Sequence, residues 1–348
     1  MKTVYIGLSG GVDSSVSAAL LKEQGYKVVG VYMKNWSQDL PGLPCPWKDD
    51  FTDAKRVAVQ LGIDFKLYDF EKQYREKVVD YMLDEFKAGR TPNPDIMCNQ
   101  EIKFKLFLDT ALEDGADLVA TGHYANVKAG RLFKARDENK DQTYFLYRVS
   151  KKALGKTLFP LGGHTKPQVR ELARKFGLVT AGKKESMGIC FVGKVGIKEF
   201  LEQYVDKRPG DIIDSRGQVI GRHDGAVFYT IGQRHGLEVG GGLPYYVVGK
   251  DMRKNGVHVT TDLQDEKLWS DKIRFTSAHW ISGEPADSPR LAVRTRHRAK
   301  LIPVKILNKT SNLIWEAELE EEVRALTPGQ SAVFYSGDEC LGGGVVTL

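Results

Sequence analysis

The sequence predicts an α/β protein with a doubly wound, mostly parallel sheet, followed by a small β-rich central domain and a C-terminal domain resembling a β-barrel. Over roughly the first third of the chain, short apolar runs alternate with segments of helical spacing, a pattern typical of a parallel sheet. From about Pro209 the helical periodicity disappears and glycines become frequent. The chain of 348 residues is also longer than a single hydrophobic core usually serves.

The expected elements follow one another in strand–helix order. Apolar runs predict strands at residues 2–8, 28–33, 63–70 and 118–122. Apolar residues three or four apart predict helices at residues 14–24, 51–61, 71–87, 98–112 and 167–176, and we expect the segment 145–205 to be mostly helical. Ligands of such sheets bind beyond the carboxyl ends of the strands. The turn after the first strand, Met33 and Gly122 all fall at such ends.

These changes in composition and periodicity divide the chain into three expected domains. Residues 1–205 form the α/β domain, residues 206–268 the small central β-rich domain, and residues 269–348 the C-terminal barrel. Glycines and short apolar runs dominate the last two segments, as they do in small barrels.

Composition narrows the class of protein. The chain is 41% hydrophobic and 28% charged, as in a globular protein, and no apolar run is as long as a membrane span. The N-terminus enters a strand without a signal segment, which favours the cytoplasm. The four cysteines contain no C-x-x-C pair, so we expect neither a structural zinc site nor a disulfide framework. We expect a monomer with no metal site built from protein groups alone.

The segment S-G-G-V-D-S, residues 9–14, combines two glycines with serine hydroxyls directly behind the first strand. Glycine permits positive φ and leaves room for a ligand. Backbone N–H groups, the start of the next helix and the hydroxyls of Ser9, Ser14 and Ser15 together suit an anion such as pyrophosphate. The pattern is neither G-x-x-x-x-G-K-[ST] nor G-x-G-x-x-G.

Two cysteines lie in segments that favour a reactive thiolate. Cys98 follows the N-P-D sequence and is expected to open a helix, where the helix dipole lowers a thiol pKa. Asp95 is placed either to cap that helix or to handle a proton. Cys190 follows Lys183 and Lys184 in a loop-like segment. The alternative for each cysteine is that it is a buried residue that acts as a small apolar side chain. The spacing along the chain does not by itself show that the two cysteines meet.

Two basic segments favour contact with RNA. Residues 288–315 carry seven basic residues and no acidic one, and the alternation of Arg294, Arg296, Arg298 and Lys300 would place all four on one face of a strand. Residues 128–156 carry nine basic and three acidic residues, with Tyr144, Phe145 and Tyr147 among them. Basic surfaces with aromatic rings suit phosphate contact and base stacking. The alternative is a solvated strand face on a basic protein.

The order of residues 9–14 resembles the signature of the ATP pyrophosphatases, or PP-loop enzymes. Further segments, in the same order along the chain, are similar to the tRNA-specific 2-thiouridylase family. They are M-K-N-W (33–36), G-R-T-P-N-P-D (89–95) with C-N (98–99), I-K-F (102–104), T-G-H-Y-A (121–125), K-D-Q (140–142) and G-I-C-F (188–191).

This resemblance implies ATP-dependent 2-thiolation of the wobble uridine, U34, of a tRNA. ATP, with Mg²⁺, would adenylate the C2 oxygen. Cys190 would carry a persulfide from a donor fed by a cysteine desulfurase, and Cys98 would be the nucleophile that frees its sulfur. A transient Cys98–Cys190 disulfide, AMP and pyrophosphate would result, and a reductant would reopen the disulfide.

The resemblance also assigns binding residues by position. Asn93, Pro94 and Asp95 would meet the target base, and Lys140, Asp141, Gln142, Arg296 and His297 would contact tRNA, although the family often has tyrosine at the position of His297. ATP would be bound by Gly7, Leu8, Ser9, Gly10, Gly11, Val12, Asp13, Ser14, Met33 and Gly122. Without the resemblance, Met33 is equally a core residue, Gly122 a simple turn, and residues 140–142 a solvated loop.

Other functions remain open at this stage. A PP-loop enzyme acting on a different acceptor, such as an amidating ligase or a nucleotide synthetase, has no need of two cysteines in loops. An RNA-binding protein that uses ATP as a structural ligand would release no pyrophosphate. A third possibility is an iron–sulfur cluster held by Asp95, Cys98 and Cys190, although most clusters use more thiolates.

Overall fold

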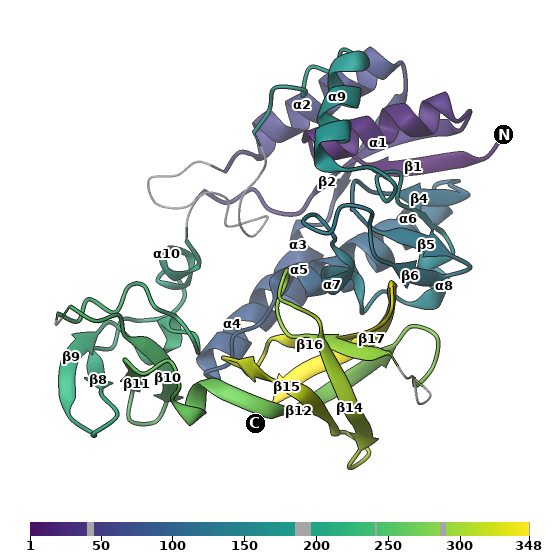
Figure 1. The fold of residues 1–348 in the computed structure, drawn as a ribbon. Coiled ribbons are helices and arrows are strands. Elements are labelled where there is room, and N and C mark those ends of the chain that lie inside the picture. The colour runs from purple at the N-terminus through teal and green to yellow at the C-terminus, as the bar shows by residue number, and fades with distance from the viewer. Residues whose placement is uncertain (40–44, 185–195, 241, 286–289, 348) are drawn as a thin grey trace.

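The computed structural model describes residues 1–39, 45–184, 196–240, 242–285 and 290–347. Three bodies of secondary structure follow one another along the chain (Figure 1): an α/β body in purple and blue, a small green sheet, and a barrel in green and yellow. The Cys190 segment, residues 185–195, lies outside the described residues.

The first body is built on a five-stranded parallel sheet in the order β3-β2-β1-β4-β7. The doubly wound parallel sheet is thereby confirmed. The sequence missed β7, because two residues carry no pattern. The strands are β1 (Thr3–Gly7), β2 (Lys27–Lys34), β3 (Asp64–Asp69), β4 (Leu118–Ala120) and β7 (Thr157–Leu158).

Helices cover both faces of this sheet because alternate strand residues point in opposite directions. Ile6 and Val28 pack with Ala54 of α2, and α1 joins the same cluster. Val29 packs on the opposite face, with Phe107 of α6 and Val78. The helices are α1 (Val12–Glu23), α2 (Trp47–Leu61), α3 (Glu71–Tyr74), α4 (Asp80–Lys87) and α6 (Phe107–Glu113).

Three helix predictions need correction. The helix at residues 71–87 contains a π-helical turn, η1 (Arg75–Val79). The helix expected from Cys98 begins earlier, with α5 (Pro94–Met97), and continues through the π-helical η2 (Cys98–Leu106) into α6. Less than half of the described part of residues 145–205 is helical, because turns with proline and glycine interrupt it near residue 160. Its helices are α7 (Thr143–Leu146), α8 (Lys151–Leu154), α9 (Lys166–Lys175) and α10 (Ile197–Leu201).

The central β-rich domain and the C-terminal barrel are both present. The central sheet has the order β10-β11-β8-β9. In the barrel, the order β12-β15-β14-β13-β16-β17 closes through a β12–β17 pairing, and Phe275, Trp315 and Phe334 fill its core. The elements are β8 (Gly210–Ile213), β9 (Val219–His223), η3 (Ala226–Phe228), β10 (Tyr246–Asp251), β11 (Gly256–Thr260), η4 (Glu266–Leu268), β12 (Trp269–Trp280), β13 (Leu291–Arg294), β14 (Ile302–Lys309), β15 (Trp315–Arg324), β16 (Ser331–Ser336) and β17 (Glu339–Thr347).

A hairpin from the first body joins the sheet of the barrel. It consists of β5 (Asn126–Lys128) and β6 (Arg131–Phe133), and β6 pairs antiparallel with β17. Arg131 adds a bidentate ion pair to Glu339 of β17. This hairpin was not predicted, because strands of three residues are too short to show alternation.

Among the helices of the described ranges, none is both long and apolar enough to span a membrane.

Candidate active site

The turn between β1 and α1 is held in shape by its own hydrogen bonds and by the backbone of Asp50. Gly10 has φ +71°, and a Cβ there would lie 2.4 Å from the Asp50 carbonyl oxygen. The Ser14 hydroxyl donates to the Gly11 carbonyl at 3.1 Å and accepts from the Ser9 N–H at 3.2 Å. Glycine is therefore required at position 10, and the turn is preorganised as an anion cradle.

The three serines of this turn have different roles. Ser9 is exposed, so its hydroxyl is available to a ligand. Ser15 is fully buried and donates to the Gly11 carbonyl at 2.7 Å. The expectation that the Ser15 hydroxyl helps to bind an anion was therefore wrong, because the helix end uses it.

Asp13 is held in place by groups far away in the sequence. The Lys166 ammonium lies 2.7 and 2.9 Å from its two carboxylate oxygens, and the Tyr124 hydroxyl donates to it at 2.9 Å. Sequence reasoning missed Lys166. A signal existed, since a lysine at the first position of a helix lies at the positive end of the dipole and needs an acidic partner.

Steric constraints account for two of the glycines beyond the strand ends. A Cβ on Gly122 would lie 2.8 Å from the backbone nitrogen of Ser14, and a Cβ on Gly7 would lie 2.8 Å from Cε of Met33. The loop after β4 thus touches the start of α1, and Met33 lies over the end of β1. The structure brings these expected ATP contacts to one edge of the sheet.

Cys98 is buried in the second turn of its helix. Asn93 precedes the first helical residue, Pro94, so Asp95 lies inside the first turn and is not the cap. The dipole effect expected for Cys98 is therefore weaker than predicted, because it fades beyond the first turn. Burial raises the pKa of the Asp95 carboxyl, and the positive charge of Lys103 partly opposes this.

The barrel clamps the loop that leads to Cys98. The Thr91 N–H donates to the Pro328 carbonyl at 2.8 Å, and the Gln330 side chain donates to the Thr91 carbonyl at 2.8 Å. Gly329, at φ +93°, has no room for a Cβ, which would lie 2.8 Å from the Thr91 nitrogen. Sequence reasoning missed all three barrel residues, because nothing local links them to a loop more than 230 positions away.

Cys190 lies outside the described residues, but the chain just before its segment is anchored beside the turn. The Lys183 ammonium pairs with Asp50 at 2.8 Å and Asp53 at 2.7 Å. Arg170 donates to the Lys183 carbonyl at 2.7 Å. Because the Asp50 backbone packs against Gly10, the described chain enters this segment next to the anion cradle.

Two expected tRNA-binding segments meet in space. A guanidinium nitrogen of Arg294 lies 3.4 Å from a carboxylate oxygen of Asp141, and the positive charge of Lys140 helps to lower the pKa of His297. Burial and the cations Arg298, Arg294 and Lys140 lower the pKa of His297 to about 4, so its ring is neutral at pH 7. That ring lies 4.6 Å from the Phe145 ring.

Two of these side chains already make hydrogen bonds within the protein. Asp141 is buried and accepts from the Ala135 N–H and the Thr143 hydroxyl. Arg296 donates to the carbonyls of Ile231 and Ala325. Both residues therefore hold their loops in shape. Lys140, Gln142 and His297 remain partly exposed.

The expected strand over residues 294–300 was wrong. Strand β13 ends at Arg294, and Arg298 has φ +63°. The alternating cations consequently do not share one face: Arg294 and Arg296 point to internal partners, while the exposed Lys300 pairs with Glu321 at 2.6 Å.

A path of hydrogen bonds connects the anion cradle to the Cys98 helix. Tyr124 donates to Asp13 through its hydroxyl, and its N–H donates to the Gln142 side chain at 2.9 Å. The Phe145 N–H donates to the Gln142 carbonyl, and the Phe145 carbonyl accepts from Asn99 at 3.0 Å. Four short segments of the first body thus form one connected site around the two features that the sequence singled out.

Comparison with known proteins places this arrangement in a family. tRNA-specific 2-thiouridylase MnmA of Bacillus velezensis is 50% identical over 99% of this chain and 94% of its own length. The enzyme of the same name from Bacillus subtilis is 49% identical over the same shares. The chain belongs to the tRNA-specific 2-thiouridylase family. Family descriptions match in three parts: "tRNA methyl transferase HUP domain" over residues 2–194, "tRNA methyl transferase PRC-barrel domain" over 198–261, and "Aminomethyltransferase beta-barrel domain" over 270–346.

Two further cysteines have other surroundings in this member of the tRNA-specific 2-thiouridylase family. Cys340 of β17 is buried against the Thr143 backbone, and burial strongly raises its thiol pKa, so it is a structural residue. Cys45 is half-buried, and burial raises the pKa of its thiol as well. Neither environment favours a thiolate.

Proposed function

We propose that this protein thiolates C2 of the wobble uridine, U34, of tRNA at the expense of ATP. The observation that carries the proposal is the hydrogen-bonded path from Asp13 through Tyr124 to the helix of Cys98. This path joins a turn suited to binding phosphates to a cysteine that is preceded by a carboxyl group. A reaction that couples adenylation to sulfur transfer requires both features. Relatives of about 50% identity bear the name of this activity.

The first step uses the cradle. The backbone of residues 9–14 and the Ser9 hydroxyl would hold the phosphates of ATP while the uridine C2 oxygen attacks the α-phosphorus. An O–P bond forms there, and the bond to pyrophosphate breaks. Mg²⁺ bound with ATP would offset the phosphate charge. No group of three metal-binding side chains occurs among the described residues, so the ion would be held mainly by the nucleotide.

The second step uses the cysteines. The Cys98 thiolate attacks the Cys190 sulfur of a Cys190 persulfide, forming the Cys98–Cys190 disulfide and releasing hydrosulfide. Hydrosulfide adds to C2 of the activated uridine, and AMP leaves with the former C2 oxygen. A dithiol reductant returns both cysteines to thiols. The direction of the Asp95 pKa shift, raised by burial, suits a group that takes up a proton during the reaction.

The substrate would lie against the cluster that joins the first body to the barrel. Asn93, Pro94 and Asp95 would face the target base. Lys140 and Gln142 would contact the tRNA backbone, and the neutral His297 ring, beside Phe145, would offer a stacking surface. Asp141 and Arg296 would contribute by holding these loops in shape.

The partners of the reaction follow from its chemistry. A protein donor fed by a cysteine desulfurase would supply the persulfide sulfur, and one monomer would act on one tRNA. Because tRNA is used in the cytoplasm, we place the reaction there. An iron–sulfur cluster held by Asp95, Cys98 and Cys190 is the rival mechanism.

The test is mass spectrometry of nucleosides from unmodified tRNA incubated with the protein, ATP, Mg²⁺ and a persulfide source. We expect wobble 2-thiouridine from the wild type, none from Cys98→Ala or Cys190→Ala, and normal yield from the matched control Cys45→Ala. AMP formation without thiolation would move the acceptor elsewhere. Thiolation by both active-site variants would refute the two-cysteine mechanism, and activity that requires bound iron would favour the cluster.

A further inference from the structure

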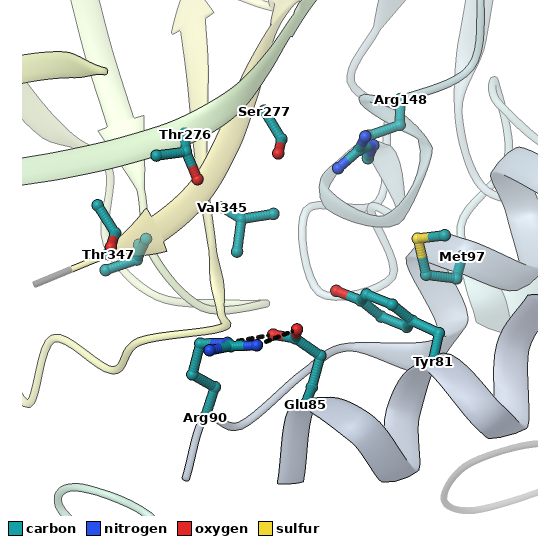
Figure 2. A pocket seen from close by; sticks show the side chains of 10 residues that line it. Tyr81, Glu85, Arg90, Met97, Arg148, Thr276, Ser277, Val345 and Thr347 are labelled. Atoms are coloured by element: carbon teal, nitrogen blue, oxygen red, sulfur yellow. Dashed lines mark hydrogen bonds and ion pairs between the residues drawn. The ribbon is translucent and has the colours of Figure 1, made fainter. Parts of the chain in front are cut away.

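A cavity of about 360 Å³ lies between the α/β body and the barrel, behind the loop that leads to Cys98. One wall comes from α4 and the loop behind it, through Tyr81, Glu85 and Arg90. The opposite wall comes from β12 and β17. Arg148 and Met97 complete it (Figure 2).

The charge of this cavity is positive. Glu85 is neutralised by Arg90, whose Nε donates to it at 2.6 Å. Arg148 has no acidic partner among the described residues, and its Nε is buried without a hydrogen-bond partner there. Figure 2 shows the guanidinium of Arg148 directed toward the space between Ser277 and Tyr81. A buried donor of this kind is costly unless something accepts its hydrogen bond.

The barrel wall is distorted where it faces Arg148. Ser277 has φ +51°, and the pairing of β12 with β17 shifts register between Thr276 and His279. A serine in the left-handed region is uncommon, and a bulge re-aims the side chains around it. Here the distortion adds the Ser277 hydroxyl to the cavity lining.

We propose that this cavity binds a phosphate group, carried either by the tRNA backbone or by a free small molecule. Arg148 supplies the charge, and the hydroxyls of Ser277, Thr276 and Tyr81 supply donors from other directions. A guanidinium and several hydroxyl donors on the lining of one cavity suit a phosphate group, which offers more acceptor oxygens than a carboxylate. Met97 and Val345 leave an apolar side for the group that carries the phosphate.

A phosphate bound in the cavity would affect the active site, because the lining includes Met97, the residue before Cys98, and Arg90 of the loop that leads to Cys98. A phosphate between Arg148 and Ser277 would also link the two bodies that shape that loop. The proposal does not depend on the proposed thiolation, since it concerns binding alone.

The test is calorimetric titration of inorganic phosphate into the full chain. The cradle at residues 9–14 is unchanged in Arg148→Gln and Ser277→Gly, so differences from the wild type report on the cavity. We expect the wild type to bind one more phosphate than either variant, or the variants to bind it about tenfold more weakly. Arg174→Gln, which removes an exposed arginine on α9, is the matched control.

Ser277→Gly separates ligand binding from folding. Glycine relieves the positive φ, so this variant should be at least as stable as the wild type while losing the phosphate. A second arm measures tRNA affinity against salt. Weaker tRNA binding by Arg148→Gln, with a salt slope smaller by about one, assigns the phosphate to the tRNA backbone.

Unchanged tRNA binding with lost phosphate binding assigns the site to a free phosphate compound. If both variants match the wild type in phosphate stoichiometry, phosphate affinity and tRNA affinity, the proposal is wrong.

Discussion

The turn of residues 7–14 and the loop of residues 89–98 serve the same site but are held in different ways. The turn is fixed by hydrogen bonds from the Ser9 N–H to the Ser14 hydroxyl and from that hydroxyl to the Gly11 carbonyl, and by contacts inside the α/β body. The loop is held from outside, by Pro328, Gly329 and Gln330 of the barrel. The half of the site proposed to bind ATP is therefore built within the α/β body, whereas the cysteine half depends on a domain that begins far along the chain.

This difference predicts that damage to the barrel can disable Cys98 without disturbing the binding of ATP. Substitutions of residues that pack on the turn inside the α/β body should conversely disturb the turn itself. The following substitutions test that separation.

The largest effect is expected from Gly122→Ala. The new Cβ would lie 2.8 Å from the Ser14 nitrogen and push the start of α1 away from its place. We expect ATP binding and thiolation to fall at least about 100-fold and the free energy of unfolding to fall by about 1–3 kcal/mol. Gly163→Ala, where nothing lies within 4 Å, is the control. Normal ATP affinity in Gly122→Ala would contradict this steric explanation.

A smaller and more selective effect is expected from Gly329→Ala. Its Cβ would meet the Thr91 backbone, so thiolation should fall about tenfold or more through a displaced Cys98 loop. The affinity for an ATP analogue should remain normal. Gly115→Ala has a matching φ of +95° with nothing within 4 Å of the new Cβ, and it should keep its thiolation rate. Equal losses in both variants would attribute the effect to φ strain alone.

The next effect depends on pH. His297 has a pKa lowered to about 4, mainly by burial, so the unfolded state binds a proton that the folded state does not between about pH 6.5 and 4. The stabilising effect of a neutral His297 should therefore be lost as pH falls through that window. Chemical denaturation at pH 7.5 and pH 5 should show a smaller loss for His297→Gln than for the wild type, by roughly 1 kcal/mol. His235→Gln, at an exposed histidine, should follow the wild type.

The smallest effect is expected from Lys300→Gln. This exposed lysine pairs with Glu321 on the barrel surface, and such pairs contribute about 0–1 kcal/mol. The denaturation midpoint should barely move. A large loss of stability would mean that the loop after β13 is held more tightly than its contacts indicate.

What the sequence could predict follows the same division between local and distant contacts. The parallel sheet, the turn after β1 and the strand-end glycines have patterns within a few residues, and they were found. The clamp on Thr91, the ion pair of Lys166 with Asp13 and the β5–β6 hairpin depend on partners more than 100 positions away.

Errors arose where an alternating or helical pattern had a second explanation. Arg294 and Arg296 alternate because both reach internal acceptors near the end of a strand, and not because they share a solvent face. The start of the Cys98 helix was misplaced because Pro94 was assigned to the loop, whereas proline is favoured at the first position of a helix.

The β5–β6 hairpin has a consequence for how the chain acquires its structure. Its partner, β17, is made more than 200 residues later, and β17 also closes the barrel against β12. During synthesis, β6 therefore keeps an unpaired edge until β17 has been made. An unpaired strand edge can pair with another chain. The matched family segments should accordingly not behave as independent units: the α/β body expressed alone would carry that open edge, and we expect it to self-associate.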